Sequence, residues 1–185
     1  GLAYHGSRLG IPTTIAMPLS TPFIKITNTK ALGAEVVQIG KTFDETANAA
    51  LEISKSKDLT LVHPFDNFLV MAGQGTIAIE FLKDVPDLDF LLVSVGGGGL
   101  ISGVATAAKA IKPDIQIIGV QSERFPSLYR AFNNEEYTAQ GSTLAEGIAV
   151  KTIGKKIAKS IELNSILFYY SKSVLNIKSN VFSAH

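Results

Sequence analysis

The strongest constraint on this chain is a run of four glycines between two apolar segments. Residues 90–95 have the length and composition of a buried strand, and residues 100–111 have the apolar spacing of a helix. Each glycine costs about 0.5–1 kcal/mol where no special backbone conformation is needed, so four in a row indicate a requirement. A strand that turns into a helix through glycines leaves main-chain N–H groups free, and phosphate is the ligand that we expect there.

The glycine spacing argues against the two common nucleotide-binding loops. The pattern G-x-G-x-x-G needs a third glycine where Ile101 or Ser102 stands, and no Gly-Lys-Ser/Thr follows for a P-loop. A dinucleotide oxidoreductase is therefore disfavoured. A site for one phosphate monoester remains, and a glycine turn that is only a tight connection stays an open alternative.

Composition places the chain among α/β proteins of one domain or two small ones. Of its 185 residues, 46% are hydrophobic and 18% charged, which is enough apolar material for a sizeable core. A net charge of +1 gives no electrostatic footprint for nucleic acid. The absence of cysteine excludes disulfides and thiolate metal sites. No apolar run approaches the ~20 residues of a membrane span and no secretory signal opens the chain, so we expect a cytoplasmic protein without membrane contact.

Strand and helix patterns alternate along the chain. Alternation of this kind predicts βαβ units and parallel pairing. Predicted helices cover residues 2–9, 22–32, 44–56, 75–82 and 100–111, and predicted strands cover residues 13–17, 35–39, 59–63, 90–95 and 115–120. Thr21 and Thr76 are expected to cap two of these helices. Residues 166–170 are also strongly β-prone.

Several short motifs, in a fixed order, resemble those of the pyridoxal-phosphate enzymes of the tryptophan-synthase β-subunit fold. Within that superfamily the serine/threonine dehydratases, and among them the bacterial catabolic type, are most similar. The motifs span roughly residues 1–161: Ala3-Tyr4-His5, Leu9-Gly10-Ile11-Pro12, Met17-Pro18, Ala31-Leu32-Gly33-Ala34-Glu35, His63-Pro64-Phe65-Asp66, Ala72-Gly73-Gln74-Gly75-Thr76, Gly96 to Leu100, Gly119-Val120-Gln121-Ser122-Glu123 and Leu144-Ala145-Glu146-Gly147.

The resemblance implies a partial fold-type II enzyme, with parallel twisted sheets flanked by helices. Residues 1–59 would form part of a small, mobile domain that closes over substrate. Residues 60–162 would form part of a large cofactor domain, and residues 163–185 a divergent tail. Pyridoxal 5'-phosphate is the implied cofactor. Its phosphate would be held by the residues of the glycine loop, Gly96, Gly97, Gly98, Gly99 and Leu100.

The resemblance also implies an activity. The parent enzyme would be an ammonia-lyase, converting L-threonine to 2-oxobutanoate and ammonium or L-serine to pyruvate. It would act in amino-acid metabolism, including isoleucine biosynthesis, with a small amino-acid substrate and as a homo-oligomer. Serine racemase, a β-replacing synthase and a catalytically inactive phosphate-binding fragment stay open as alternatives.

Parts of the family pattern do not match this chain. The lysine that bonds the cofactor aldehyde lies in a Ser-Phe-Lys-type motif upstream of Gly1, and the serine near the pyridine nitrogen would fall beyond His185. None of the lysines in the body of the chain has a matching context, so we expect no catalytic residue here and an inactive, poorly soluble or self-associating fragment. The sequence after Glu162 diverges, which is typical of a truncation, a disrupted reading frame or an engineered piece.

The resemblance also bears on the loop at His63 and on two polar residues, Gln121 and Glu146. The loop at His63 would face the cofactor with Phe65 near its ring, although a packed structural histidine is the competing interpretation. Gln121 stands where some relatives have an acidic cation ligand, so we predict no metal site. Glu146, where the family usually has aspartate, is interpreted as a solvated surface charge.

Overall fold

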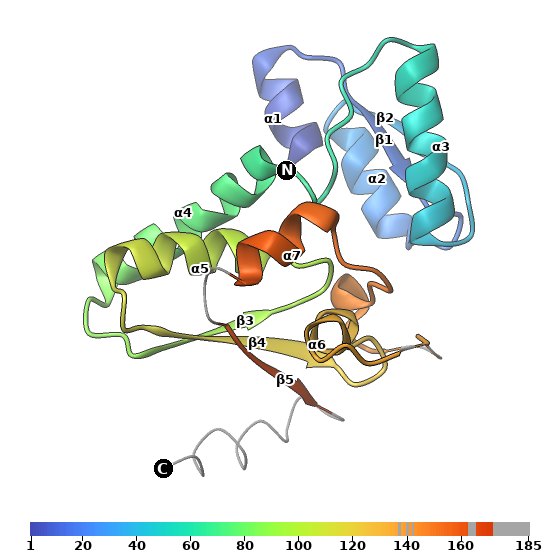
Figure 1. The fold of residues 1–185 in the computed structure, drawn as a ribbon. Helices are drawn as coiled ribbons and strands as arrows, with labels where there is room; N and C mark the ends of the chain where they lie inside the picture. Colours follow the sequence, from blue (N-terminus) through green and yellow to red (C-terminus); the bar gives the residue numbers. More distant parts are fainter. Residues whose placement is uncertain (137, 140, 142, 163–165, 172–185) are drawn as a thin grey trace. The chain divides into compact units, whose positions relative to one another are not determined.

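The computed structural model describes residues 1–136, 138, 139, 141, 143–162 and 166–171. Its contacts divide the chain into two compact units, one covering Gly1–Val62 and the other beginning at His63. Figure 1 shows the helices and strands of each unit. The sequence-based boundary at residue 59 and the domain roles attached to it remain predictions.

The first unit is built around two short parallel strands. Thr14 pairs with Glu35 and Met17 with Gln38. Gly10, with φ 66°, ends the first helix in the left-handed conformation, as the sequence indicates. The elements in chain order are α1 (Leu2–Leu9), β1 (Thr14–Met17), α2 (Phe23–Ala31), β2 (Glu35–Gln38) and α3 (Phe43–Ser56).

The second unit carries a three-stranded parallel sheet in the order β3-β4-β5. Leu92 lies opposite Ile118, and Val120 opposite Tyr169. Helices α4 and α5 lie side by side on one face of this sheet (Figure 1). The elements are α4 (Phe68–Asp84), β3 (Phe90–Ser94), α5 (Gly99–Ile111), β4 (Gln116–Ser122), α6 (Ser127–Phe132), the 3-10 turn η1 (Glu146–Ile148), α7 (Lys155–Glu162) and β5 (Leu167–Ser171). Parallel α/β architecture is therefore confirmed.

One predicted strand is wrong. Residues 59–63 form no strand, and Leu59, Leu61 and Val62 are each about two-fifths exposed. The segment is rich in apolar and β-branched residues, which favour a strand only where a neighbouring strand and a buried face are present. In the described part of the chain this segment has neither, and it connects the two units.

Two predicted caps are also wrong. Helix α4 begins at Phe68, seven residues earlier than expected, because the Asn67 side chain accepts hydrogen bonds from the N–H groups of Leu69 (2.8 Å) and Val70 (3.3 Å). Thr76 therefore lies inside the helix, where its hydroxyl donates to the Gly73 carbonyl. Helix α2 begins after Pro22, without a side-chain cap from Thr21.

The core of the second unit lies between the helix pair and the sheet. Alternate β3 residues Leu91 and Val93 point into it, while Phe90 and Leu92 on the other face are about half exposed. Among the described residues, its fully buried side chains are Ala78, Val95, Ile101, Val104, Ala105, Ala108, Ile115, Ile117, Leu128 and Ile157. Within the described part of the chain, no helix has the length and apolarity needed to cross a membrane.

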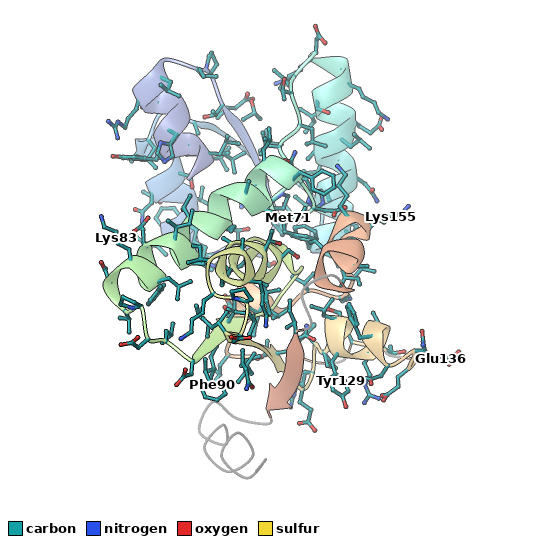
Figure 2. The ribbon with its side chains drawn as sticks, turned by 60° about the vertical axis from the view of Figure 1, so that its left-hand side comes forward. Met71, Lys83, Phe90, Tyr129, Glu136 and Lys155 are labelled. Atoms are coloured by element: carbon teal, nitrogen blue, oxygen red, sulfur yellow. The ribbon has the colours of Figure 1, made fainter. Side chains whose placement is uncertain are left out.

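Helices α4 and α5 approach closely because glycines face each other at their crossing. A Cβ on Gly75 would lie 2.9 Å from the Gly103 carbonyl oxygen, and a Cβ on Gly103 would overlap the main-chain carbonyl of Met71. Met71 is on α4 (Figure 2). Main-chain atoms cannot move aside as a flexible side chain can, so this crossing requires both glycines.

We expect Gly103→Ala to lower the free energy of unfolding of the second unit by about 1–3 kcal/mol through overpacking. Gly73→Ala is the matched control, since Gly73 is in α4 with no neighbouring atom within 4 Å of its Cβ position. It should raise that free energy by about 0.5–1 kcal/mol through helix propensity. Denaturant unfolding monitored by circular dichroism measures both. Equal effects of the two substitutions would contradict a close helix crossing.

Candidate functional site

The glycine loop begins where the parallel sheet ends. The Val95 N–H donates to the Val120 carbonyl over 2.9 Å, which extends the β3–β4 pairing by one residue. The buried side chain of Gln121 donates to the carbonyls of Val95 and Phe125, each over 3.4 Å, and accepts from the Tyr129 N–H over 2.9 Å. These bonds fix the main chain directly before Gly96.

Gly98 turns the chain from the strand into helix α5. Its φ of 94° is in the left-handed region, which glycine adopts without a steric cost. The helix has no side-chain N-cap. Both the N–H and the hydroxyl of Ser102 instead donate to the Gly98 carbonyl, over 3.1 and 2.8 Å, and hold the first turn together.

The main-chain amides of this loop make no hydrogen bond within the part of the chain that the structure describes. Among the described residues, no hydrogen bond is donated by the N–H of Gly96, Gly97, Gly98, Gly99 or Leu100. The last two belong to the first turn of α5, where no intrahelical acceptor exists and the helix dipole is positive. Unbonded N–H groups at such a terminus are the chemistry that binds a phosphate oxygen.

Three separate segments pack against the glycines on the side where side chains would project. A Cβ on Gly97 would lie 2.5–2.6 Å from ring atoms of Phe65, and a Cβ on Gly99 would lie 2.8 Å from the Phe65 main-chain oxygen. A Cβ on Gly98 would lie 2.5 Å from Cγ2 of Ile157, and a Cβ on Gly96 3.1 Å from Cα of Ile148. A Cβ at Gly97, Gly98 or Gly99 would therefore lie within 2.8 Å of a neighbouring atom, and a Cβ at Gly96 would make a tight contact. Leu100 is half-buried and packs against the core.

His63 organises the turn that carries Phe65. Its Nδ1 accepts hydrogen bonds from the N–H groups of Phe65 (3.3 Å) and Asp66 (2.9 Å). The His63 and Phe65 rings meet edge to face with centroids 4.6 Å apart. Burial lowers the pKa of His63, the Asp66 carboxylate opposes that change, and the Lys156 charge lowers the pKa further. A neutral imidazole with Nδ1 as acceptor fits both the bonds and the pKa direction.

The residues singled out in the sequence, Phe65, Glu146 and Gln121, lie in different environments. Phe65 packs directly against the glycine loop, so the His63–Asp66 turn is part of the candidate site. Glu146 is exposed in η1, in line with a solvated charge. Gln121 is buried and uses its amide for the main-chain bonds described above. No group of three or more His, Asp or Glu side chains that could hold a metal ion occurs in the described part of the chain.

Sequence reasoning missed the contribution of helix α7 to this site. Ile157 of α7 contacts Gly98, and Asp66 accepts hydrogen bonds from the first amides of the same helix. The 3.6-residue apolar spacing could have revealed the helix, but no local signal reports a contact between segments about 90 residues apart.

Comparison with known proteins identifies relatives over nearly the whole chain. A family model described as "Pyridoxal-phosphate dependent enzyme" matches residues 1–171. An L-threonine ammonia-lyase from Thermotoga maritima is 46% identical over 156 residues, covering 83% of this chain and 39% of that protein. A catabolic L-threonine dehydratase from Staphylococcus aureus is 44% identical over 158 residues, covering 84% of this chain and 46% of that protein. The chain therefore spans less than half of the length of these relatives.

Solved structures agree. The processed form of threonine deaminase isoform 2 from Solanum lycopersicum superposes with a TM-score of 0.83 at 37% identity, covering 92% of this chain and 50% of that one. Maize serine racemase superposes with the same TM-score of 0.83 at 26% identity, covering 92% of this chain and 53% of that one.

The His63 turn predicts a pH dependence of stability. Because the folded-state pKa lies below the ordinary value of about 6.5, the unfolded chain binds the proton first as the pH falls. The contribution of His63 to the free energy of unfolding is therefore complete above about pH 6.5 and is lost as the pH falls through the lowered pKa. His63→Asn should retain stability at pH 7.5 and weaken this dependence, since Asn67 shows that an Asn oxygen can accept from two following amides.

Urea unfolding at pH 7.5 and pH 5.5 measures this effect. His5→Asn is the matched control, because His5 lies on helix α1 of the first unit. We expect the control to keep the pH dependence of the second unit. An unchanged pH dependence in His63→Asn would show that the turn does not need a neutral imidazole.

Proposed function

This chain belongs to the family of pyridoxal-phosphate dependent enzymes, and from that premise we propose that it forms the phosphate-holding part of an ammonia-lyase acting on L-threonine or L-serine. The observation that carries the proposal is the set of unbonded main-chain amides at the start of α5. The names of relatives at 44–46% identity support the substrate class.

The residues of the loop fit the phosphate group of this cofactor. Gly96, Gly97, Gly98, Gly99 and Leu100 would hold it through their N–H groups, with the positive end of the α5 dipole beneath it. The space that Cβ atoms would need at Gly97, Gly98 and Gly99 is already filled by protein, so the loop requires glycine at these three positions to keep this conformation. When bound, pyridoxal phosphate supplies an electron sink for the electrons left when the substrate α-proton departs.

The chain's own contribution is placement of the cofactor. Phe65 and Ile157 pack against the loop where glycine side chains would project, and Ser102 fixes the first helical turn. A phosphate held by several of these amides would restrain the cofactor next to the end of β3. Such placement is what the protein supplies in cofactor enzymes, while the cofactor supplies the chemistry.

The parent reaction that we propose is conversion of L-threonine to 2-oxobutanoate and ammonium, or of L-serine to pyruvate. Serine racemase is the nearest alternative, and it is supported by the similarity to the maize enzyme at 26% identity. We also propose that the first unit belongs to the substrate-closing domain of the parent. We propose a homo-oligomer, because the half-exposed apolar side chains of Phe90 and Leu92 on the sheet could be covered by a second copy of the protein. We also propose a cytoplasmic location.

Phosphate recognition can be tested with two ligands that differ only in the phosphate. By isothermal titration calorimetry, we expect the chain to bind pyridoxal 5'-phosphate at least about tenfold more tightly than pyridoxal, a difference of about 1.4 kcal/mol. Gly98→Ala should remove this preference, since Gly98 has φ 94° and a Cβ would lie 2.5 Å from Ile157. Gly73→Ala, on open helix surface, should keep it. Equal affinity for both ligands would refute the phosphate site.

Borohydride trapping tests the inactive-fragment alternative. After incubation with pyridoxal 5'-phosphate and reduction, we expect peptide mass spectrometry to find no preferred lysine, because none of the lysines stands in a Ser-Phe-Lys-type motif. The Gly98→Ala variant, treated in the same way, should give the same labelling pattern. Preferential labelling of one lysine that disappears in Gly98→Ala would instead indicate a reactive centre within this chain.

A further inference from the structure

Asp66 joins two parts of the second unit that are far apart in sequence. Its carboxylate accepts hydrogen bonds from the first N–H groups of helix α7: Lys155 donates to Oδ2 over 3.2 Å, and Lys156 to Oδ1 over 3.0 Å. Lys155 stands at the beginning of this helix (Figure 2). A carboxylate that receives two first-turn amides is a strong helix cap, because charge-assisted bonds add to the attraction of the dipole.

The approach of Asp66 to α7 is close enough to restrict the sequence there. A Cβ on Gly154, the residue before α7, would overlap the Asp66 carboxylate. Gly154 is itself buried. The carboxylate therefore sits directly on the main chain that leads into the helix, and no side chain can separate them.

Helix α7 in turn supports the glycine loop. Ile157 lies one helical turn or less from the capped amides, is fully buried, and meets the position where a Gly98 side chain would project. A shift of the α7 N-terminus would therefore move the group that packs against the left-handed residue of the loop. Phe65, next to Asp66 in sequence, packs against Gly97 and Gly99.

We propose that Asp66 is a positioning residue for the phosphate-binding loop: by capping α7 it holds Ile157 against Gly98 while its neighbour Phe65 holds Gly97 and Gly99. The role of Asp66 in phosphate binding rests on the proposed function of the loop. Asp66 has no direct contact with the loop amides in this arrangement and acts through α7 and Phe65. Its loss should therefore change the conformation of the loop as well as the stability of α7.

The test uses the full chain labelled with 15N-glycine. In the absence of ligand, Asp66→Ala should shift the amide resonances of Gly97, Gly98 and Gly99. Gly154→Ala should shift the same resonances, because it displaces the carboxylate from the other side. Asp66→Asn, which retains one acceptor oxygen and a good capping group, should restore part of the wild-type pattern.

Asn67→Ala is the matched control, since Asn67 is adjacent and also caps a helix, but caps α4 rather than α7. It should lower the thermal unfolding midpoint without the shifts at Gly97 to Gly99. In titrations with pyridoxal 5'-phosphate, Asp66→Ala and Gly154→Ala should each raise the dissociation constant about threefold to tenfold, and Asn67→Ala should leave it within about twofold.

The outcomes separate this proposal from the function of the loop. If Asp66→Ala and Gly154→Ala leave the loop glycine resonances unchanged, Asp66 only stabilises α7 and the positioning proposal is overturned. If those resonances shift while the wild-type chain shows no preference for pyridoxal 5'-phosphate over pyridoxal, the positioning of the loop is supported and the phosphate function fails. Shifts of the same size in Asn67→Ala would also overturn the proposal, because they would report general loosening of the unit.

Discussion

The site depends on one main-chain turn, in which Gly98 takes a left-handed conformation and the chain passes from β3 into α5. A residue with a Cβ is disfavoured there by backbone sterics and by Ile157 at the same time. The turn also sets the start of α5. Residues Ile101, Val104, Ala105 and Ala108 form the buried face of this helix and are part of the core of the second unit. The anion site and the hydrophobic core thus share one backbone element, and a change in the turn affects both.

Glycines that make close approach possible also make a loop flexible, so rigidity has to come from elsewhere. Here it comes from contacts distant in sequence: Phe65 from the turn before α4, Ile157 from α7, and Gly147, Ile148 and Val150 from η1 and the residues after it. The strand end is fixed separately by Gln121, through bonds to Val95 and Tyr129. The loop is therefore preorganised by its surroundings rather than by its own sequence. This explains why a ligand could bind it without first ordering it.

Local signals in the sequence were enough for the parallel α/β architecture and for the strand–glycine–helix unit, because periodicity and glycine placement are properties of short segments. They failed at residues 59–63, where apolar composition suggested a strand, but the described part of the chain holds no strand beside this segment. The early start of α4 was readable in principle, since Asn67 directly precedes an apolar run. The hydrogen bonds between the Asp66 carboxylate and the first amides of α7 could not be predicted, because they join segments that only the tertiary fold brings together.

Placement of a phosphate is compatible with more than one reaction. Structures that superpose equally well on this chain carry the names of a threonine deaminase and a serine racemase, so enzymes with different names share the fold. In the proposed function the loop would hold the part of the cofactor that does not react, and its amides would meet only phosphate oxygens. Discrimination between reactions must then come from groups around the amino-acid part of the bound substrate. Because a phosphate-holding loop would do the same work in each of these reactions, it does not need to change conformation between them. A rigid loop suits that role, and the contacts of Phe65, Asp66 and Ile157 make this loop rigid.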